Sequence, residues 1–237
     1  KIYRNENVFP LGYVANDLLS EKELGRYGFP YRQELLLRGT TNFKTAIKPA
    51  AVMLPDRIKS PSKAERILPL DRPAPEDEVL FLEMKVKNLT PNQDISIKIQ
   101  NEQNRLSARN HLYYNGNTVY HFAVSVKKGE TGLAAVFSPG EYELSSIRSY
   151  TMSAAALAAA GRKAGPFKVS SIGVRDSVIS GTVDAPEDGW LVTTVPYDES
   201  FRITVDGDEV AFRKVNTAFV GFPIEKGSHD VVFQYAS

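Results

Sequence analysis

The chain has 237 residues, of which 42% are hydrophobic and 24% are charged. This composition is typical of a globular protein and is enough for one large or two small domains. Its 29 basic and 28 acidic residues leave a net charge of +1, which argues against a domain-wide basic surface for nucleic acid. Because the sequence has no cysteine, disulfides and thiolate zinc sites are excluded.

The chain begins at Lys1, and its sequence contains no signal peptide and no apolar run of roughly 18 residues. We therefore expect a fragment of a longer protein. If that parent protein spans a membrane, its spans lie outside this sequence. The lack of cysteine also favours an extracytoplasmic bacterial protein that folds without disulfides.

Residues 1–66 are predicted to form a strand and helix segment that packs on the sheet region after it. The best helix candidate runs from Pro30 to Arg38. Pro30 suits the first helical position, the three leucines that follow are good helix formers, and Gly39 lies where a C-cap belongs. This segment is too short to bury a core alone, so we expect it to cover a neighbouring sheet.

Residues 67–152 are predicted to form an antiparallel β-sandwich of jelly-roll type, similar in architecture to carbohydrate-binding modules. Ile95, Ile97 and Ile99 alternate with polar residues, which is the period of a half-buried strand. Further strand-like runs recur every 8 to 15 residues with turn signals between them. This spacing is typical of sandwiches and jelly rolls.

Residues 153–166 are predicted to form a bridging helix, because they are rich in alanine and end at glycine and proline. Residues 167–237 then predict a second, smaller antiparallel β region. Its clearest signal is Asp206-Gly207 between two alternating runs, since both positions of a tight hairpin need a positive φ. The fold class is therefore mainly β, with two or three short peripheral helices.

The sequence contains no set of residues that predicts catalysis, a metal site or a cofactor site. His111, His121 and His229 are far apart and lack partners at ligand spacing. Neighbouring acidic residues, such as Asp198 and Glu199, face opposite ways on a strand. They therefore do not resemble the facing carboxylates of a glycosidase.

Aromatic residues beside asparagines give the one candidate binding site. Tyr113, Tyr114 and Tyr120 lie close to Asn115 and Asn117. Exposed tyrosine rings stack on sugar faces and amides bind sugar hydroxyls, so these five residues are candidates for glycan binding. The alternative interpretation is that the rings fill the sandwich core or flank a hairpin.

Three stretches of the chain resemble one family of bacterial membrane proteins, the YfhO type. The N-terminal stretch reads YRNENVFPLGYV, the next reads PYRQELLLRG, and the terminal stretch begins DGWLVTTVPYDESF. The matching terminal positions are Pro196, Tyr197, Asp198, Val205, Asp206, Gly207, Gly227, His229 and Tyr235. Ser200-Phe201 departs from the Gly-Trp that is usual in the family.

The resemblance implies a polytopic membrane protein with a GT-C-like glycosyltransferase core. Such proteins are thought to transfer a sugar from a lipid-linked donor to cell-wall polymers such as lipoteichoic acid. The catalytic acids lie on loops between early membrane helices, so the resemblance assigns no catalytic residue to this chain. It implies a domain at the cell membrane, on its extracytoplasmic side.

Two functions follow as hypotheses. In the first, the domain is non-catalytic and recruits a teichoic-acid or glycan acceptor for the membrane part of the same chain. In the second, it is a purely structural or protein-interaction domain that packs on that membrane part and binds no glycan.

Overall fold

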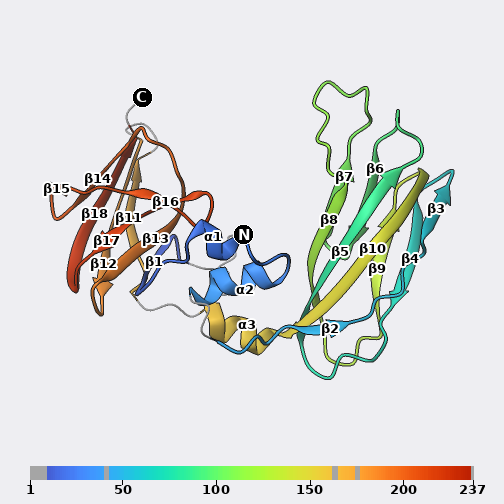
Figure 1. The fold of residues 1–237 in the computed structure, drawn as a ribbon, viewed down its shortest axis with the longest axis horizontal. Coiled ribbons are helices and arrows are strands. Elements are labelled where there is room, and N and C mark those ends of the chain that lie inside the picture. Colours follow the sequence, from blue (N-terminus) through green and yellow to red (C-terminus); the bar gives the residue numbers. More distant parts are fainter. Residues whose placement is uncertain (1–9, 40–42, 162–164, 174–176, 236–237) are drawn as a thin grey trace. The chain divides into compact units, whose positions relative to one another are not determined.

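The computed structural model describes residues 10–39, 43–161, 165–173 and 177–235 (Figure 1). The chain divides into two compact units. One consists of residues 45–157, and the other combines residues 1–44 with residues 158–237. Residues 1–9 and 162–164, which belong to the predicted N-terminal and bridging segments, lie outside the described residues.

The unit of residues 45–157 is a jelly roll. Its strands are β2 (Lys48–Ala50), β3 (Arg57–Ser60), β4 (Ala64–Pro69), β5 (Glu78–Asn88), β6 (Ile95–Ile99), β7 (Glu102–Leu106), β8 (Val119–Val126), β9 (Gly132–Phe137) and β10 (Gly140–Ser153). One sheet has the order β2-β10-β5-β8, with β3 also on β10, and the other has the order β4-β9-β6-β7. If β2 and β3 count as one position, the orders become 1-8-3-6 and 2-7-4-5, those of two nested Greek keys.

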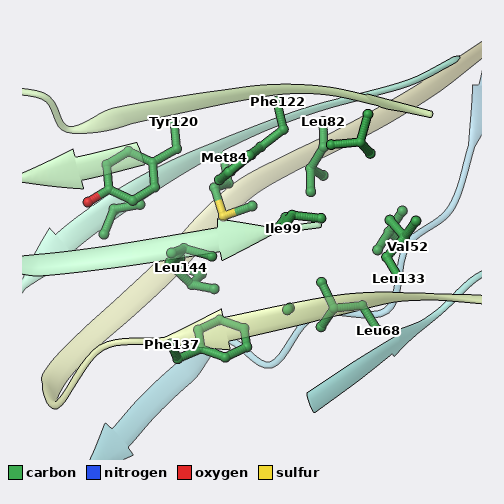
Figure 2. Packing of buried hydrophobic residues seen from close by; sticks show 14 of the residues in the cluster. Val52, Leu68, Leu82, Met84, Ile99, Tyr120, Phe122, Leu133, Phe137 and Leu144 are labelled. Atoms are coloured by element: carbon green, nitrogen blue, oxygen red, sulfur yellow. The ribbon is translucent and has the colours of Figure 1, made fainter. Parts of the chain in front are cut away.

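The jelly-roll core follows from the alternation in its strands. Leu82 and Met84 of β5 and Phe122 of β8 point inwards from one sheet, and Ile99 and Phe137 meet them from the other (Figure 2). All five side chains are buried. The predicted fold class, an antiparallel sandwich of jelly-roll type, is therefore confirmed, but the unit is residues 45–157 and includes β2 and β3, which lie before the predicted start at residue 67.

The second unit is also a sandwich of two antiparallel sheets. Its strands are β1 (Gly12–Ala15), β11 (Lys168–Gly173), β12 (Val178–Ala185), β13 (Gly189–Pro196), β14 (Phe201–Val205), β15 (Asp208–Glu209), β16 (Arg213–Val215), β17 (Phe219–Ile224) and β18 (Gly227–Tyr235). The sheet orders are β1-β13-β17-β16 and β11-β12-β18-β14-β15. Phe222 of the first sheet packs against Phe233 of the second, with ring centroids 5.8 Å apart.

The N-terminal segment differs from the prediction. We predicted that residues 1–66 pack on the jelly roll, but β1 pairs with β13, so that Gly12 lies opposite Thr193. Residues 1–44 belong to the C-terminal unit, and only the later part of the segment joins the jelly roll. The C-terminal region is consequently larger than the sequence suggests. A pairing over about 180 residues leaves no local signal, because a strand's alternation does not specify its partner.

Three short helices complete the described part of the chain: α1 (Glu21–Leu24), α2 (Tyr31–Arg38) and α3 (Ala154–Gly161). The predicted cap of α2 is confirmed, since Gly39 has a φ of 70° and its N–H binds the carbonyl of Leu35. The division between the two units falls within α3. None of the described helices has the length and hydrophobicity needed to cross a bilayer.

The predicted hairpin at Asp206-Gly207 is also confirmed. The two residues have φ values of 54° and 93° and connect β14 to β15. The Asp206 carboxylate has a further role, because it accepts the N–H of Asp230 at 2.8 Å and lies 2.7 Å from Nδ1 of His229. The turn is thereby tied to β18.

Candidate functional site

The candidate site lies at one end of the jelly roll, around the loop of residues 107–118 that connects β7 to β8. Figure 1 shows this loop extending beyond the ends of both strands. Asn115 organises the loop, since its side-chain oxygen accepts the N–H groups of Ser107 and Asn117, each at 3.1 Å. Its amide nitrogen donates to the carbonyl of Arg105 at 2.9 Å. Gly116 follows with a φ of 60°, which glycine adopts without strain.

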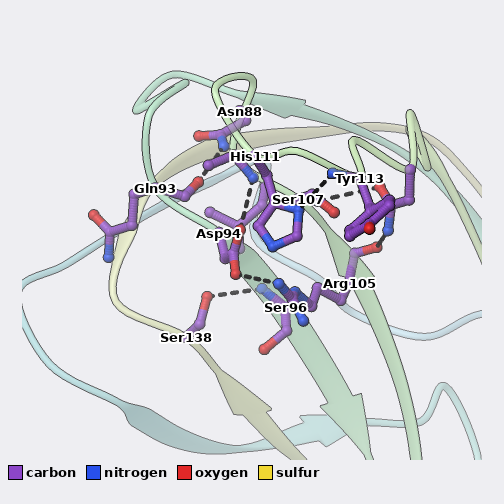
Figure 3. Close-up of polar contacts among 12 residues, drawn as sticks. Asn88, Gln93, Asp94, Ser96, Arg105, Ser107, His111, Tyr113 and Ser138 are labelled. Atoms are coloured by element: carbon purple, nitrogen blue, oxygen red, sulfur yellow. Dashed lines mark hydrogen bonds and ion pairs between the residues drawn. The ribbon is translucent and has the colours of Figure 1, made fainter.

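Asp94, in the turn between β5 and β6, holds the base of this loop (Figure 3). Its carboxylate accepts the N–H of Ala108 at 2.7 Å and pairs with the guanidinium of Arg105. The Ala108 N–H first, and Arg105 in addition, lower the pKa of Asp94 below its ordinary value. The carboxylate therefore stays charged at neutral pH and keeps the loop base fixed.

The structure separates the predicted tyrosines. Tyr113 and Tyr114 are 78% and 47% exposed, so both rings are accessible. Tyr120 is fully buried, and its hydroxyl donates to the carbonyl of Ile95 at 3.1 Å. Its predicted place in a glycan site is wrong, because it is an inward position of β8 and fills the core.

The predicted asparagines serve the loop itself. Asn115 uses both ends of its amide on the backbone, as described above, and Asn117 donates its amide to the carbonyl of Arg105 at 3.3 Å. These bonds hold the segment that carries Tyr114. The two amides thus shape the loop, and the ligand-facing groups must come from other residues.

A hollow of about 440 Å³ lies beside the loop. Tyr114 forms part of its wall, together with Lys85 and Lys87 of β5 and Arg109 of the loop. Asn88, Ser107, Thr118 and Ser145 add polar groups. Tyr113 does not line the hollow. We refer to this feature below as the cationic groove.

The charged residues that line the cationic groove are all basic. No acidic residue is among the described residues that line it. Lys87 is paired with Glu143 at 3.5 Å, whereas in the described part of the chain no ion pair engages Lys85 or Arg109. Two cations and an aromatic wall suit a ligand that combines an anionic group with a sugar or polyol.

Sequence reasoning missed Lys85 and Arg109. Lys85 is an outward position of an ordinary alternating strand, and only the fold brings it near the loop. One signal was available, because the sequence from Gln103 to Gly129 contains basic residues but no acidic residue. Such a run marks a positive surface without locating it.

Other parts of the described chain are weaker candidates for a binding site. A second hollow, of about 610 Å³, is lined by residues 49–54 and 147–150, and its one charged residue, Arg148, is already paired with Glu83. His121 and His229 are paired with Glu83 and Asp206. Among the described residues, no group of three His, Asp or Glu side chains is placed to hold a metal ion.

The whole chain, residues 1–237, matches the sequence profile of a family described as "Bacterial membrane protein YfhO". A curated relative, the "Uncharacterized protein YfhO" of Bacillus subtilis strain 168, is 19% identical over 255 residues. The match covers 99% of this chain but 29% of that protein, so the chain spans less than a third of its relative.

Among solved structures, a cupin 2 conserved barrel domain protein from Leptotrichia buccalis is similar at 12% identity, over 84% of this chain and 92% of its own. The TM-score is 0.16, so the fold assignment rests on the strand order alone.

Proposed function

Because the chain belongs to the YfhO family of bacterial membrane proteins, we propose that it is a non-catalytic domain that recruits an acceptor polymer. In this proposal, the parent protein transfers a sugar from a lipid-linked donor to a cell-wall polymer such as lipoteichoic acid. The domain lies on the extracytoplasmic side and presents that polymer to the membrane part of its own chain.

The cationic groove is the observation that carries this proposal. A teichoic acid repeats phosphate and polyol or sugar units, so its recognition needs cations next to a stacking surface. Lys85 and Arg109 supply cations that no ion pair engages within the described residues, and Tyr114 supplies the ring. Because these side chains are exposed, each of their contacts with a ligand is weak. A polymer with repeated phosphates can bind more tightly than a single phosphate, because several weak contacts form on one molecule.

Titration of the 237-residue chain with polyglycerol-phosphate oligomers tests the proposal, read by NMR shifts and calorimetry. The expected result is binding that weakens with salt and moves resonances of residues 85–88 and 107–118. A neutral glucan oligomer with the same number of units should bind more weakly. Silence towards both ligands would refute polymer recruitment.

Two variants locate the site. Lys85→Gln and Tyr114→Ala should each weaken binding about threefold to tenfold, the size expected when one exposed charge or stacking surface is removed. Lys98→Gln is the matched control, because Lys98 is an exposed lysine on β6 and does not line the cationic groove. Equal weakening by all three variants would indicate nonspecific attraction.

The second candidate function is structural, and β11 is the observation that favours it. This strand lies at the edge of its sheet, and it exposes Val169 and Ile172. An open edge with apolar side chains can pair with another strand, here one from the absent part of the same chain. Ile172→Lys in the full-length protein would then reduce its folded yield, and an unchanged yield would exclude this role.

A further inference from the structure

The tip of the loop, His111 to Tyr113, exposes more apolar surface than its neighbours. Leu112 is 84% exposed, and Tyr113 beside it is 78% exposed. Single exposed hydrophobic side chains are ordinary on protein surfaces. These two are adjacent, and the loop that carries them extends beyond the ends of β7 and β8 (Figure 1).

Hydrogen bonds hold this tip outwards. The N–H of Tyr113 donates to Nδ1 of His111 at 3.0 Å, and the N–H of His111 donates to the carbonyl of Ala108 at 3.0 Å (Figure 3). The N–H of Arg109 donates to the carbonyl of Pro91 at 2.7 Å. The loop base is therefore anchored to the β5–β6 turn, and Leu112 is displayed rather than folded back onto the sandwich.

The charges around the tip are positive. Arg109 lies three residues before Leu112, and Lys85 lies across the cationic groove from the loop. The nearby carboxylate of Asp94 is already neutralised by Arg105. Two adjacent apolar side chains, one of them a tyrosine, with basic residues nearby match the boundary of an anionic bilayer, where tyrosine sits at headgroup level and basic side chains meet lipid phosphates.

We propose that the loop tip docks on the surface of an anionic lipid bilayer. Leu112 and Tyr113 enter the boundary between headgroups and acyl chains, and Arg109 contacts lipid phosphates. The apolar part of this site is distinct from the cationic groove, because neither Leu112 nor Tyr113 lines it, whereas Arg109 belongs to both. Docking would place the cationic groove beside the membrane surface.

Vesicle flotation of the 237-residue chain tests the proposal. The chain should float with vesicles of equal parts phosphatidylglycerol and phosphatidylcholine and much less with phosphatidylcholine alone. The double variant Leu112→Ser, Tyr113→Ser should weaken vesicle binding about tenfold, since it removes the apolar contribution. Ile67→Ser is the matched control, because Ile67 is 67% exposed on β4 of the same unit.

A fluorescent reporter gives a second reading that does not depend on loss of binding. The only tryptophan of the chain, Trp190, lies in the other unit. In Leu112→Trp, anionic vesicles should shift the emission to shorter wavelength, and brominated lipids should quench it. The unsubstituted 237-residue chain should show neither effect.

Three results would overturn the proposal. The first is no vesicle binding by the unsubstituted chain at low salt. The second is vesicle binding by the Leu112→Ser, Tyr113→Ser variant that equals that of the unsubstituted chain. The third is equal binding to neutral vesicles, which would exclude the anionic surface. Conversely, a double variant that loses vesicle binding but still binds polyglycerol phosphate would separate this site from the cationic groove.

Discussion

The two sandwiches of this chain use their connections differently. In the jelly roll, the loop of residues 107–118 projects and displays Leu112, Tyr113 and Tyr114. In the C-terminal sandwich, acidic residues of the connections bind the chain's own backbone, as Asp94 also does at the base of the jelly-roll loop: Asp188 accepts the N–H of Lys226, Asp198 that of Ser200, and Asp206 that of Asp230. Two of the positions that carry the family resemblance, Asp198 and Asp206, thus serve turns of the fold.

This contrast teaches that recognisable positions and binding positions need not coincide. Val205, Asp206 and Gly207 are recognisable because a tight hairpin admits few residues. The cationic groove uses lysine, arginine and tyrosine on outward positions, where many residues are compatible with the fold. Ligand contacts are therefore expected in the jelly roll and not at Val205, Asp206 and Gly207.

The largest expected effect tests whether both cores are equally well packed. Phe137 of the jelly roll and Phe233 of the C-terminal sandwich are each fully buried. Replacing either with alanine should lower the free energy of unfolding by about 3–5 kcal/mol, because a ring-sized cavity remains. Urea unfolding followed by circular dichroism measures both variants. A loss below about 1 kcal/mol in one of them would show that its sandwich packs loosely.

A smaller effect tests the pairing of β11 with β12. A Cβ added at Gly181 would lie 2.4 Å from the carbonyl oxygen of Lys168 and 2.7 Å from the ring of Phe167. Gly181→Ala should therefore cost about 1–3 kcal/mol by overpacking. Gly28→Ala serves as the control, because nothing lies within 4 Å of its added Cβ. Equal stability of the two variants would contradict the close approach of β11.

The next effect separates the buried tyrosine from the exposed one. Tyr120→Phe leaves the carbonyl of Ile95 without its side-chain donor and should cost about 1 kcal/mol. Tyr114→Phe should leave the free energy of unfolding unchanged. Thermal unfolding of the two variants decides the point, and a destabilised Tyr114→Phe would mean that this hydroxyl also serves the fold.

The smallest expected effect is a pH dependence in the C-terminal sandwich. The hydrogen bond between His229 and Asp206 raises the pKa of His229 above 6.5. The same hydrogen bond lowers the pKa of Asp206 below 3.8. The histidine's contribution is complete below pH 6.5 and is lost as pH rises through its folded pKa. The aspartate's contribution is present above pH 3.8 and is lost on acidification through its folded pKa.

Melting curves between about pH 5 and pH 9 measure this dependence. The Tm of the unsubstituted chain should fall by a few degrees as the pH rises through the folded pKa of His229. The Tm of His229→Gln should stay nearly constant over the same pH range. An unsubstituted chain with no alkaline decrease would show that the pair adds nothing to stability.

Local patterns predicted most of the fold. Alternation at Ile95 to Ile99, the Asp206-Gly207 turn and the cap at Gly39 each depend on neighbours in sequence, and the structure has all three. The partner of β1 depends on a strand about 180 residues away, so no pattern near Gly12 contains it.

The candidate site was less predictable for the same reason. Tyr113, Tyr114 and Tyr120 look alike as residue types, and only the register of β8 turns Tyr120 inwards. Lys85 reaches the loop because β5 and β8 are neighbours in the sheet. Both facts belong to pairing between strands, which composition and spacing do not specify.

The pairing of β1 with β13 has a consequence for how the protein is made. The jelly roll of residues 45–157 interrupts the other sandwich, whose first strand leaves the ribosome long before its remaining ones. During synthesis, the jelly roll is complete before the partner strand of β1 has been made. Domains generally fold as units, in the order in which they are synthesised. The C-terminal sandwich must therefore close last, around a strand that was synthesised first.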